Sequence, residues 1–155
     1  MLPFNSDTSY LVSRLLYEPH IYAGQEDRMK DVWWAHRFFD EIETGQRIVF
    51  GVFSENTFTG CVHGTLEGDC FVAHTMFRRK VDAVKCSLIF AELLKNYCYT
   101  HDIPLRAIVG YPPEDSRVAV YMNKRFGCKD MGIAENVKFY RNGKLIPCRY
   151  MRKEI

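Results

Sequence analysis

Two histidines are the residues of this chain whose types and spacing could carry acid–base chemistry. His63 and His74 lie on two neighbouring predicted strands, and the short connection between the strands brings them close together. Because imidazole titrates near neutral pH, His74 is a candidate general base. The alternative is a strand histidine that is hydrogen-bonded to a neighbour. No third ligand accompanies the pair, so no metal site is expected.

A basic cluster, Arg78, Arg79 and Lys80, stands directly before a predicted helix. The start of a helix offers free N–H groups and the positive end of the helix dipole. The cluster therefore predicts an anion site for a nucleotide phosphate. A solvated turn between strand and helix is the alternative interpretation.

Two further groups of residues have both a functional and a structural interpretation. Glu114 and Asp115 follow a predicted strand, where a carboxylate could receive an amine proton, but Asp115 or Ser116 could instead cap the next helix. Trp33 and Trp34 are adjacent on a predicted helix, so they cannot both face one core. We expect one of them at the surface, as a pocket wall or a partner contact.

The elements that position these residues follow from the apolar pattern. Short turns between the first three strands predict an antiparallel meander, and the strand–helix–strand segment predicts a parallel pair. The sequence predicts a single domain over residues 1–155, of the α+β class, with a mixed, mostly antiparallel twisted sheet covered by helices. The predicted helices run from Ser6 or Asp7 to Pro19 and over about 27–43, 84–98 and 116–126; the predicted strands cover 47–53, 61–66, 70–77 and 105–110, followed by a hairpin of 137–140 and 145–151 around Asn142-Gly143.

Composition excludes several classes of protein. With 21 Lys and Arg against 19 Asp and Glu, the net charge of +2 gives no argument for nucleic-acid binding. No apolar run is long enough to span a membrane, and no signal peptide is expected. The six cysteines never form a CxxC pattern, so we interpret them as buried free thiols in a reducing compartment.

The element order resembles that of the GNAT superfamily of acyl-CoA N-acyltransferases over the whole chain. In that family an Arg/Gln-x-x-Gly-x-Gly/Ala loop after the central strand cradles the pyrophosphate of coenzyme A. Here Arg78 and Ala83 match that loop, whereas Val81 replaces a glycine and Asp82 adds a negative charge. The resemblance implies that acetyl-CoA is the cofactor, with its pantetheine between the central and crossover strands, and that the residues binding it are Phe77, Arg78, Arg79, Lys80 and Ala83.

A second signature of the family corresponds to residues 116–128. Ala119 and Gly127 are in register, and Asn123 occupies the place of the tyrosine that often protonates the departing thiolate. An amide has no titratable proton near neutral pH. Tyr121 is about 200° further round a helix, so it should not substitute. The resemblance makes Asn123 and His74 the residues at the catalytic positions.

Within that family the sequence resembles the GNAT-like proteins of tailed bacteriophages. The shared stretches are residues 15–21, His74 and Asn142-Gly143-Lys144. Two functions follow from the resemblance. The first is an N-acetyltransferase that moves an acyl group from coenzyme A to a primary amine. The second is a non-catalytic virion or head-assembly protein that binds phage structural proteins. The expected location is the host cytoplasm or the virion, without membrane or nucleic-acid partners.

Overall fold

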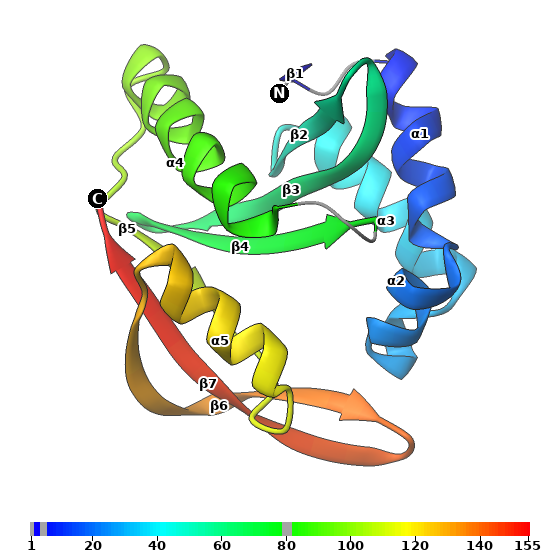
Figure 1. Cartoon of the computed structure of the whole chain (residues 1–155), viewed down its shortest axis with the longest axis vertical. Coiled ribbons are helices and arrows are strands. Elements are labelled where there is room, and N and C mark those ends of the chain that lie inside the picture. Colours follow the sequence, from blue (N-terminus) through cyan, green and yellow to red (C-terminus); the bar gives the residue numbers. More distant parts are fainter. Residues whose placement is uncertain (1, 4–5, 79–81) are drawn as a thin grey trace.

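A computed structural model describes residues 2–3, 6–78 and 82–155 of the chain (Figure 1). In this part of the chain the strands form one seven-stranded sheet in the order β1-β2-β3-β4-β5-β7-β6. The strands are β1 (Leu2–Pro3), β2 (Arg47–Ser54), β3 (Thr57–Glu67), β4 (Cys70–Phe77), β5 (Ala107–Gly110), β6 (Lys129–Arg141) and β7 (Lys144–Glu154). The helices are α1 (Ser6–Leu16), α2 (Pro19–Gly24), the 3-10 turn η1 (Asp27–Met29), α3 (Val32–Glu43), α4 (Ala83–Thr100) and α5 (Arg117–Phe126).

The sheet is antiparallel except at one place. β2, β3 and β4 form the predicted meander, β4 and β5 are parallel, and β7 is antiparallel to both β5 and β6. Helix α4 makes the crossover between the two parallel strands, as the strand–helix–strand pattern predicted. The predicted α+β class with a mixed, mostly antiparallel sheet is confirmed.

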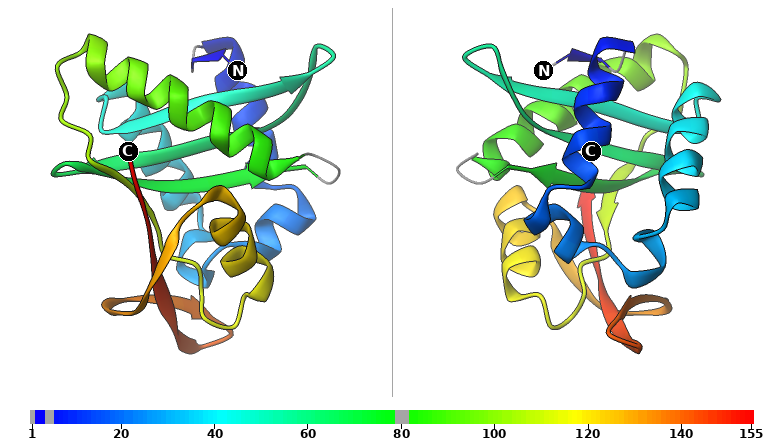
Figure 2. Two further views of the ribbon diagram at one scale, coloured as in Figure 1. Left: turned by 60° about the vertical axis from the view of Figure 1, so that its left-hand side comes forward. Right: turned by 90° about the vertical axis from the view of Figure 1, so that its right-hand side faces the viewer.

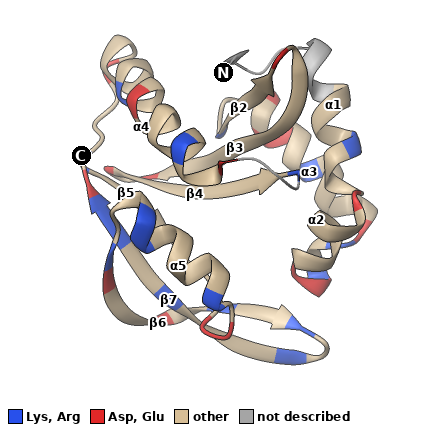
Figure 3. Cartoon of the chain, in the orientation of Figure 1, with Lys and Arg blue, Asp and Glu red and all other residues tan. Residues whose placement is uncertain are grey.

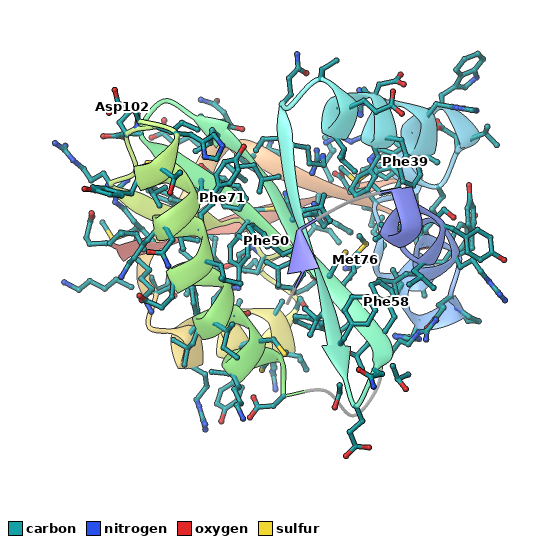
Figure 4. All side chains as sticks on the ribbon, turned by 90° about the horizontal axis from the view of Figure 1, so that it is seen from above. Phe39, Phe50, Phe58, Phe71, Met76 and Asp102 are labelled. Carbon is teal, nitrogen blue, oxygen red and sulfur yellow. The ribbon has the colours of Figure 1, made fainter. Side chains whose placement is uncertain are left out.

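Helices cover both faces of the sheet (Figure 2). On one face α4 packs on a cluster that includes Phe50, Phe71 and Phe90, whose rings meet at centroid distances of 5.5 Å. On the other face α1 and α3 pack on Phe58 and Met76. Figure 4 shows the two groups on either side of the strands. Side-chain alternation along β2, β3 and β4 supplies both cores.

The predicted helix over residues 27–43 is wrong in its first part. The chain forms η1, and α3 begins only after Asp31. The Asp31 carboxylate accepts a hydrogen bond from the backbone N–H of Trp34 at 2.7 Å, which caps α3 and ends the preceding turn. The first predicted helix, α1, ends at Leu16 ahead of Pro19, as predicted. Pro19 itself begins a further short helix, α2, that was not predicted, because a missing N–H carries no penalty at the first helical position.

The later elements follow the sequence closely, with one exception. Asn142 and Gly143 both have positive φ, 51° and 72°, as the predicted tight turn between β6 and β7 requires. Ser116 stands at the cap position of α5, but its side chain makes no capping hydrogen bond. Asp115 instead pairs with Arg141 at 3.2 Å. Ser116 therefore occupies the predicted cap position without the capping hydrogen bond, and Asp115 does not cap the helix.

None of the helices in the described ranges is long and apolar enough to cross a membrane. Both signs of charge are spread over the sheet and the helices in the view of Figure 3.

Candidate functional site

Strands β4 and β5 separate soon after they meet. Their parallel pairing joins Cys70 to Ala107, Phe71 to Ile108 and Val72 to Val109, and in the described residues it goes no further. Beyond Val72, residues 73–77 of β4 pair with β3 only, while Gly110 of β5 pairs with β7. We call the Val72–Val109 position the branch point. Figure 1 shows the two strands diverging from it.

The chain after β5 is held away from β4 by its own sequence. Pro112 and Pro113 have no N–H group with which to continue a ladder. The Pro112 carbonyl accepts the N–H of Arg149, and the Glu114 N–H donates to the Pro147 carbonyl, at 2.9 and 2.8 Å. Both bonds tie this segment to β7, so the edge of β4 beyond the branch point is left open on that side.

Strand alternation assigns the residues beyond the branch point to two faces. Val72, Val109 and Tyr111 pack in one cluster on the face covered by α1 and α3. His74 is two residues beyond Val72, so it lies on this same face. Ala73 packs instead against the cluster beneath α4, on the opposite face.

Asn123 reaches the branch point from the α4 and α5 face. A Cβ on Gly110 would lie only 2.8 Å from the Asn123 Oδ1 atom, so glycine is what allows the amide to lie against β5. The Asn123 Nδ2 atom donates to the Ala119 carbonyl at 2.9 Å. Tyr121 is 57% exposed, and its hydroxyl accepts a hydrogen bond from Arg125. The tyrosine is therefore directed away from Gly110.

The two histidines face one another across β3 and β4, as predicted. His63 and His74 are cross-strand partners, and their rings stack at 5.3 Å with an angle of 19°. Behind them, Arg47 Nη1 lies 2.9 Å from His63 Nδ1, and the Nη2 and Nε atoms of Arg47 bind Glu41 at 2.7 and 2.8 Å. An arginine has no lone pair to offer, so it donates, and His63 Nδ1 is the acceptor. We call Glu41, Arg47, His63 and His74 the histidine row.

Both imidazoles of this row are neutral at neutral pH. Burial, the neighbouring His74 and the Arg47 charge hold the pKa of His63 well below its ordinary value. The protein around His74 desolvates its ring and the Arg47 charge opposes its protonation, which together lower its pKa to about 4. His63 is 5% exposed, whereas His74 keeps contact with solvent. The exposed ring of His74 is therefore accessible to a ligand.

The residues predicted to bind the coenzyme are only partly brought together. The Phe77 carbonyl lies 3.1 Å from His20 Nε2. The Arg78 guanidinium binds the Glu18 carboxylate through Nε and donates to the Phe58 carbonyl at 3.0 Å. Arg78 is thus directed toward the start of α2 rather than that of α4. Arg79 and Lys80 lie outside the described residues.

The start of α4, at Ala83, is capped by the chain itself. The Asp82 carboxylate accepts the backbone N–H of Lys85 at 3.0 Å. This N–H belongs to the group of donors that a phosphate would use at a helix start. The sequence revealed the unfavourable charge of Asp82, but its capping role becomes visible only in the structure.

Tyr111 is a candidate that the sequence analysis did not select. Its ring stacks on Tyr150 of β7 at 5.6 Å, and burial, followed by the neighbouring Tyr150, raises the pKa of its phenol. Tyr111 is the second residue beyond Val109, as His74 is the second beyond Val72. A phenol that keeps its proton at this position can act as a general acid. Its position directly after the crossover strand is the signal that could have identified it.

The remaining candidates lie apart from the branch point. Glu114 and Asp115 are held by Arg149 and Arg141 of the hairpin. Trp33 is 80% exposed while Trp34 packs on Phe38, so the prediction that one tryptophan lies at the surface is confirmed. Both line an open recess of about 440 Å³ beside α3. In the described ranges, no group of three or more His, Cys, Asp and Glu side chains could hold a metal ion.

No family model matches the sequence, and no curated protein matches it significantly. Solved structures do match. RimL, a ribosomal-protein α-N-acetyltransferase in complex with coenzyme A, has a TM-score of 0.76 at 13% identity, with 99% of this chain and 92% of that chain covered. Spermidine N-acetyltransferase from Vibrio cholerae, with coenzyme A and spermine, has a TM-score of 0.72 at 12% identity, with 98% and 92% covered.

A GNAT-family acetyltransferase from Streptococcus pneumoniae has a TM-score of 0.69 at 14% identity, covering 99% of this chain and 97% of that chain. At such identities the likeness is one of fold. These three matches give no support to the resemblance to phage proteins, which stays a prediction from sequence. The protein has the fold of the GNAT acetyltransferase superfamily, as its element order predicted.

Proposed function

We propose that the protein is an N-acyltransferase that moves an acetyl group from coenzyme A to an amine. The observation that carries the proposal is the separation of β4 and β5 beyond Val72 and Val109, which leaves one edge of β4 open. Two similar structures of the same fold are bound to coenzyme A. Their likeness to this chain supports the same class of cofactor here.

The open edge suits an arm that carries amide groups. Residues 73–77 offer backbone N–H and C=O groups to the amides of pantetheine, in the manner of an added strand. The phosphates of coenzyme A have fewer free donors available, because the Asp82 carboxylate caps α4 and the Arg78 guanidinium is bound to Glu18. Arg79, Lys80 and the amide of Ala83 are the remaining groups proposed to hold them.

Three side chains around the branch point, those of His74, Tyr111 and Asn123, have different roles in the proposed reaction. The bound thioester supplies an acyl group that is already activated. His74, neutral at neutral pH, accepts the proton that the attacking amine must lose, directly or through one water molecule. Tyr111 is the O–H donor for the departing sulfur. Asn123 cannot transfer a proton, so its role is to position groups by hydrogen bonding.

Release of free thiol from acetyl-CoA, measured with a mixture of amines, tests the proposal. Thr75 is exposed on the open part of β4, so Thr75→Trp should obstruct the opening and abolish release. Thr100→Trp is the matched control, since Thr100 is also exposed and lies at the last residue of α4, away from the open part of β4. Thiol release by the wild type that survives Thr75→Trp would overturn the location of the site. Absence of release and of acetyl-CoA binding in the wild type would overturn the activity.

A non-catalytic role for the same fold is the second candidate. Two observations favour it: the Asp82 carboxylate takes a donor at the start of α4, and the catalytic tyrosine position holds Asn123. In this case the protein serves as an assembly partner for other proteins. It would then co-purify with particles and would not bind acetyl-CoA at millimolar concentration.

A further inference from the structure

A histidine of α2 occupies part of the open edge of β4. The N–H of Arg78 donates to the Thr59 carbonyl of β3 at 2.9 Å. In a trans peptide the C=O points opposite to the N–H, so the Phe77 carbonyl points away from β3, toward the open side of β4. There it accepts a hydrogen bond from His20 Nε2, which lies 3.1 Å away. The imidazole thus stands where an added strand would pair with this carbonyl.

An ion pair beside this hydrogen bond fastens the same helix to the end of β4. Glu18, the residue before α2, binds Arg78 Nε through Oε1, and its Oε2 atom lies 3.9 Å from His20 Nδ1. These three side chains are between 25% and 38% exposed. Ion pairs that water reaches in this way contribute little to stability. The contacts between α2 and β4 can therefore be broken at low cost.

The chain after α2 is held far more firmly, and to the other part of the sheet. Glu26 is 3% exposed, and its carboxylate accepts the N–H of Tyr140 in β6 at 2.8 Å and the Nε–H of Arg28 at 2.9 Å. Loss of either bond would leave a buried carboxylate poorly partnered, which is costly. We call residues 18–26 the strap. It has no buried residue within α2, and it bridges the two parts of the sheet that separate at the branch point (Figure 2).

We propose that the strap is a gate for the coenzyme, held closed by His20 and Glu18 and hinged at Glu26. The inference rests on the proposed N-acyltransferase function. When the pantetheine arm pairs with β4, one of its amide N–H groups replaces His20 at the Phe77 carbonyl, and the strap leaves β4 while the bond between Glu26 and Tyr140 persists. Because only the open form binds the coenzyme, the closed strap lowers the apparent affinity.

Removal of the histidine tests the gate, with acetyl-CoA as the probe and calorimetry as the measurement. His20→Ala should tighten acetyl-CoA binding at least about threefold, because the open form becomes more populated. His101→Ala is the matched control: His101 Nδ1 likewise lies 2.8 Å from a backbone carbonyl, that of Tyr97, but after the last turn of α4. It should leave the affinity unchanged. Equal or weaker binding by His20→Ala, in a variant that urea denaturation shows to be folded, would overturn the gate.

Removal of the ion pair should act in the same direction. Glu18→Gln should also tighten acetyl-CoA binding, whereas Glu154→Gln, which breaks the exposed pair of Glu154 with Arg152 in β7, should not. Because Glu18→Gln also frees Arg78, a gain in this variant alone, without one in His20→Ala, would contradict the gate.

NMR of the wild type during the same titration tests the hinge. The ring resonances of His20 should shift as acetyl-CoA binds, while the amide of Tyr140 should keep its resonance. A Tyr140 shift as large as that of His20 would place the hinge elsewhere and overturn the proposed motion.

The same binding data separate failure of the gate from failure of the proposed function. Equal affinity in the wild type, His20→Ala and Glu18→Gln would overturn the gate and leave the N-acyltransferase function intact. Absence of acetyl-CoA binding in all three at millimolar concentration would overturn the function, and the gate with it. Binding that is detected only in the two variants would support both.

Discussion

The two faces of the sheet at the branch point differ in how they depart from a simple acyltransferase site. On the α4 and α5 face, Asp82 caps the helix that would meet phosphate and Asn123 stands at the tyrosine position. On the α1 and α3 face, His63 and His74 form an ordered row with Arg47 and Glu41. Groups that could bind phosphate or donate a proton are thus fewer on the α4 and α5 face, whereas titratable and charged side chains gather on the α1 and α3 face.

The comparison teaches that the fold and the chemistry depend on different residues. The separation of β4 from β5 comes from the short β5 and the two prolines after it, which no active-site substitution alters. The polar residues on either face of the branch point can change without closing this opening. We therefore expect two kinds of variant. Substitutions in the shared core should lower the stability of the whole fold, and substitutions of polar residues on one face should change only catalysis or binding.

The largest expected effect is on the core that both faces share. Phe71 is fully buried, packs on Phe90 and fills the space above Gly64. Phe71→Ala should lower the free energy of unfolding by about 3–5 kcal/mol, measured by urea denaturation. Phe53, only partly buried, is the matched phenylalanine, and its replacement by Ala should cost less. Equal losses at the two positions would contradict the assigned core.

Replacement of one polar residue on each face tests the comparison directly. His74→Ala should lower kcat about 100-fold or more, because it removes the base. Asn123→Ala should lower kcat by less, since an amide transfers no proton. Steady-state kinetics, with urea denaturation as a check on folding, measure both. A larger loss for Asn123→Ala would place the main chemistry on the α4 and α5 face instead.

Helix caps provide a matched pair for the coenzyme side. Asp82→Asn and Asp31→Asn each replace a carboxylate that accepts a backbone N–H at a helix start, so each should change the free energy of unfolding by at most about 1 kcal/mol. Only Asp82→Asn should tighten acetyl-CoA binding, by a few-fold, because only it removes negative charge beside the phosphates. Calorimetry measures this affinity. The same gain in both variants would exclude a specific role for Asp82.

The last expected effect, confined to acid pH, is the pH dependence of stability in the histidine row. His63 and His74 have lowered pKa values in the folded protein, to about 4 for His74, against about 6.5 in the unfolded chain. Between pH 4 and 6.5 the unfolded chain therefore binds more protons, and the free energy of unfolding falls as the pH falls. The double variant His63→Gln, His74→Gln should show a flatter profile over this window. Identical profiles would mean that neither pKa is lowered.

Most elements were predictable because they bury local apolar patterns. The meander over β2, β3 and β4 and the turn at Asn142-Gly143 follow from alternation and turn chemistry. The break at Asp31 was missed, since apolar residues continue at helical spacing across it and only the capping bond to Trp34 reveals the new start.

The candidate site was predictable only where its parts are close in sequence. His63 and His74 are joined by one short turn, so their proximity could be predicted. Arg47 could not be assigned to them, because β2 places it through the sheet register and α3 supplies its partner Glu41. Tyr111 was missed for the same reason, since its position relative to His74 depends on where two strands separate.

Backbone NMR during titration with acetyl-CoA tests the central claim most directly. If the opening between β4 and β5 holds the pantetheine arm, the amide resonances of residues 73–77 and Gly110 should shift together, and Thr75→Trp should abolish the shifts. Amides at the last turn of α4, near Thr100, should not respond. Shifts confined to other parts of the molecule, or none at millimolar acetyl-CoA, would contradict the proposed site.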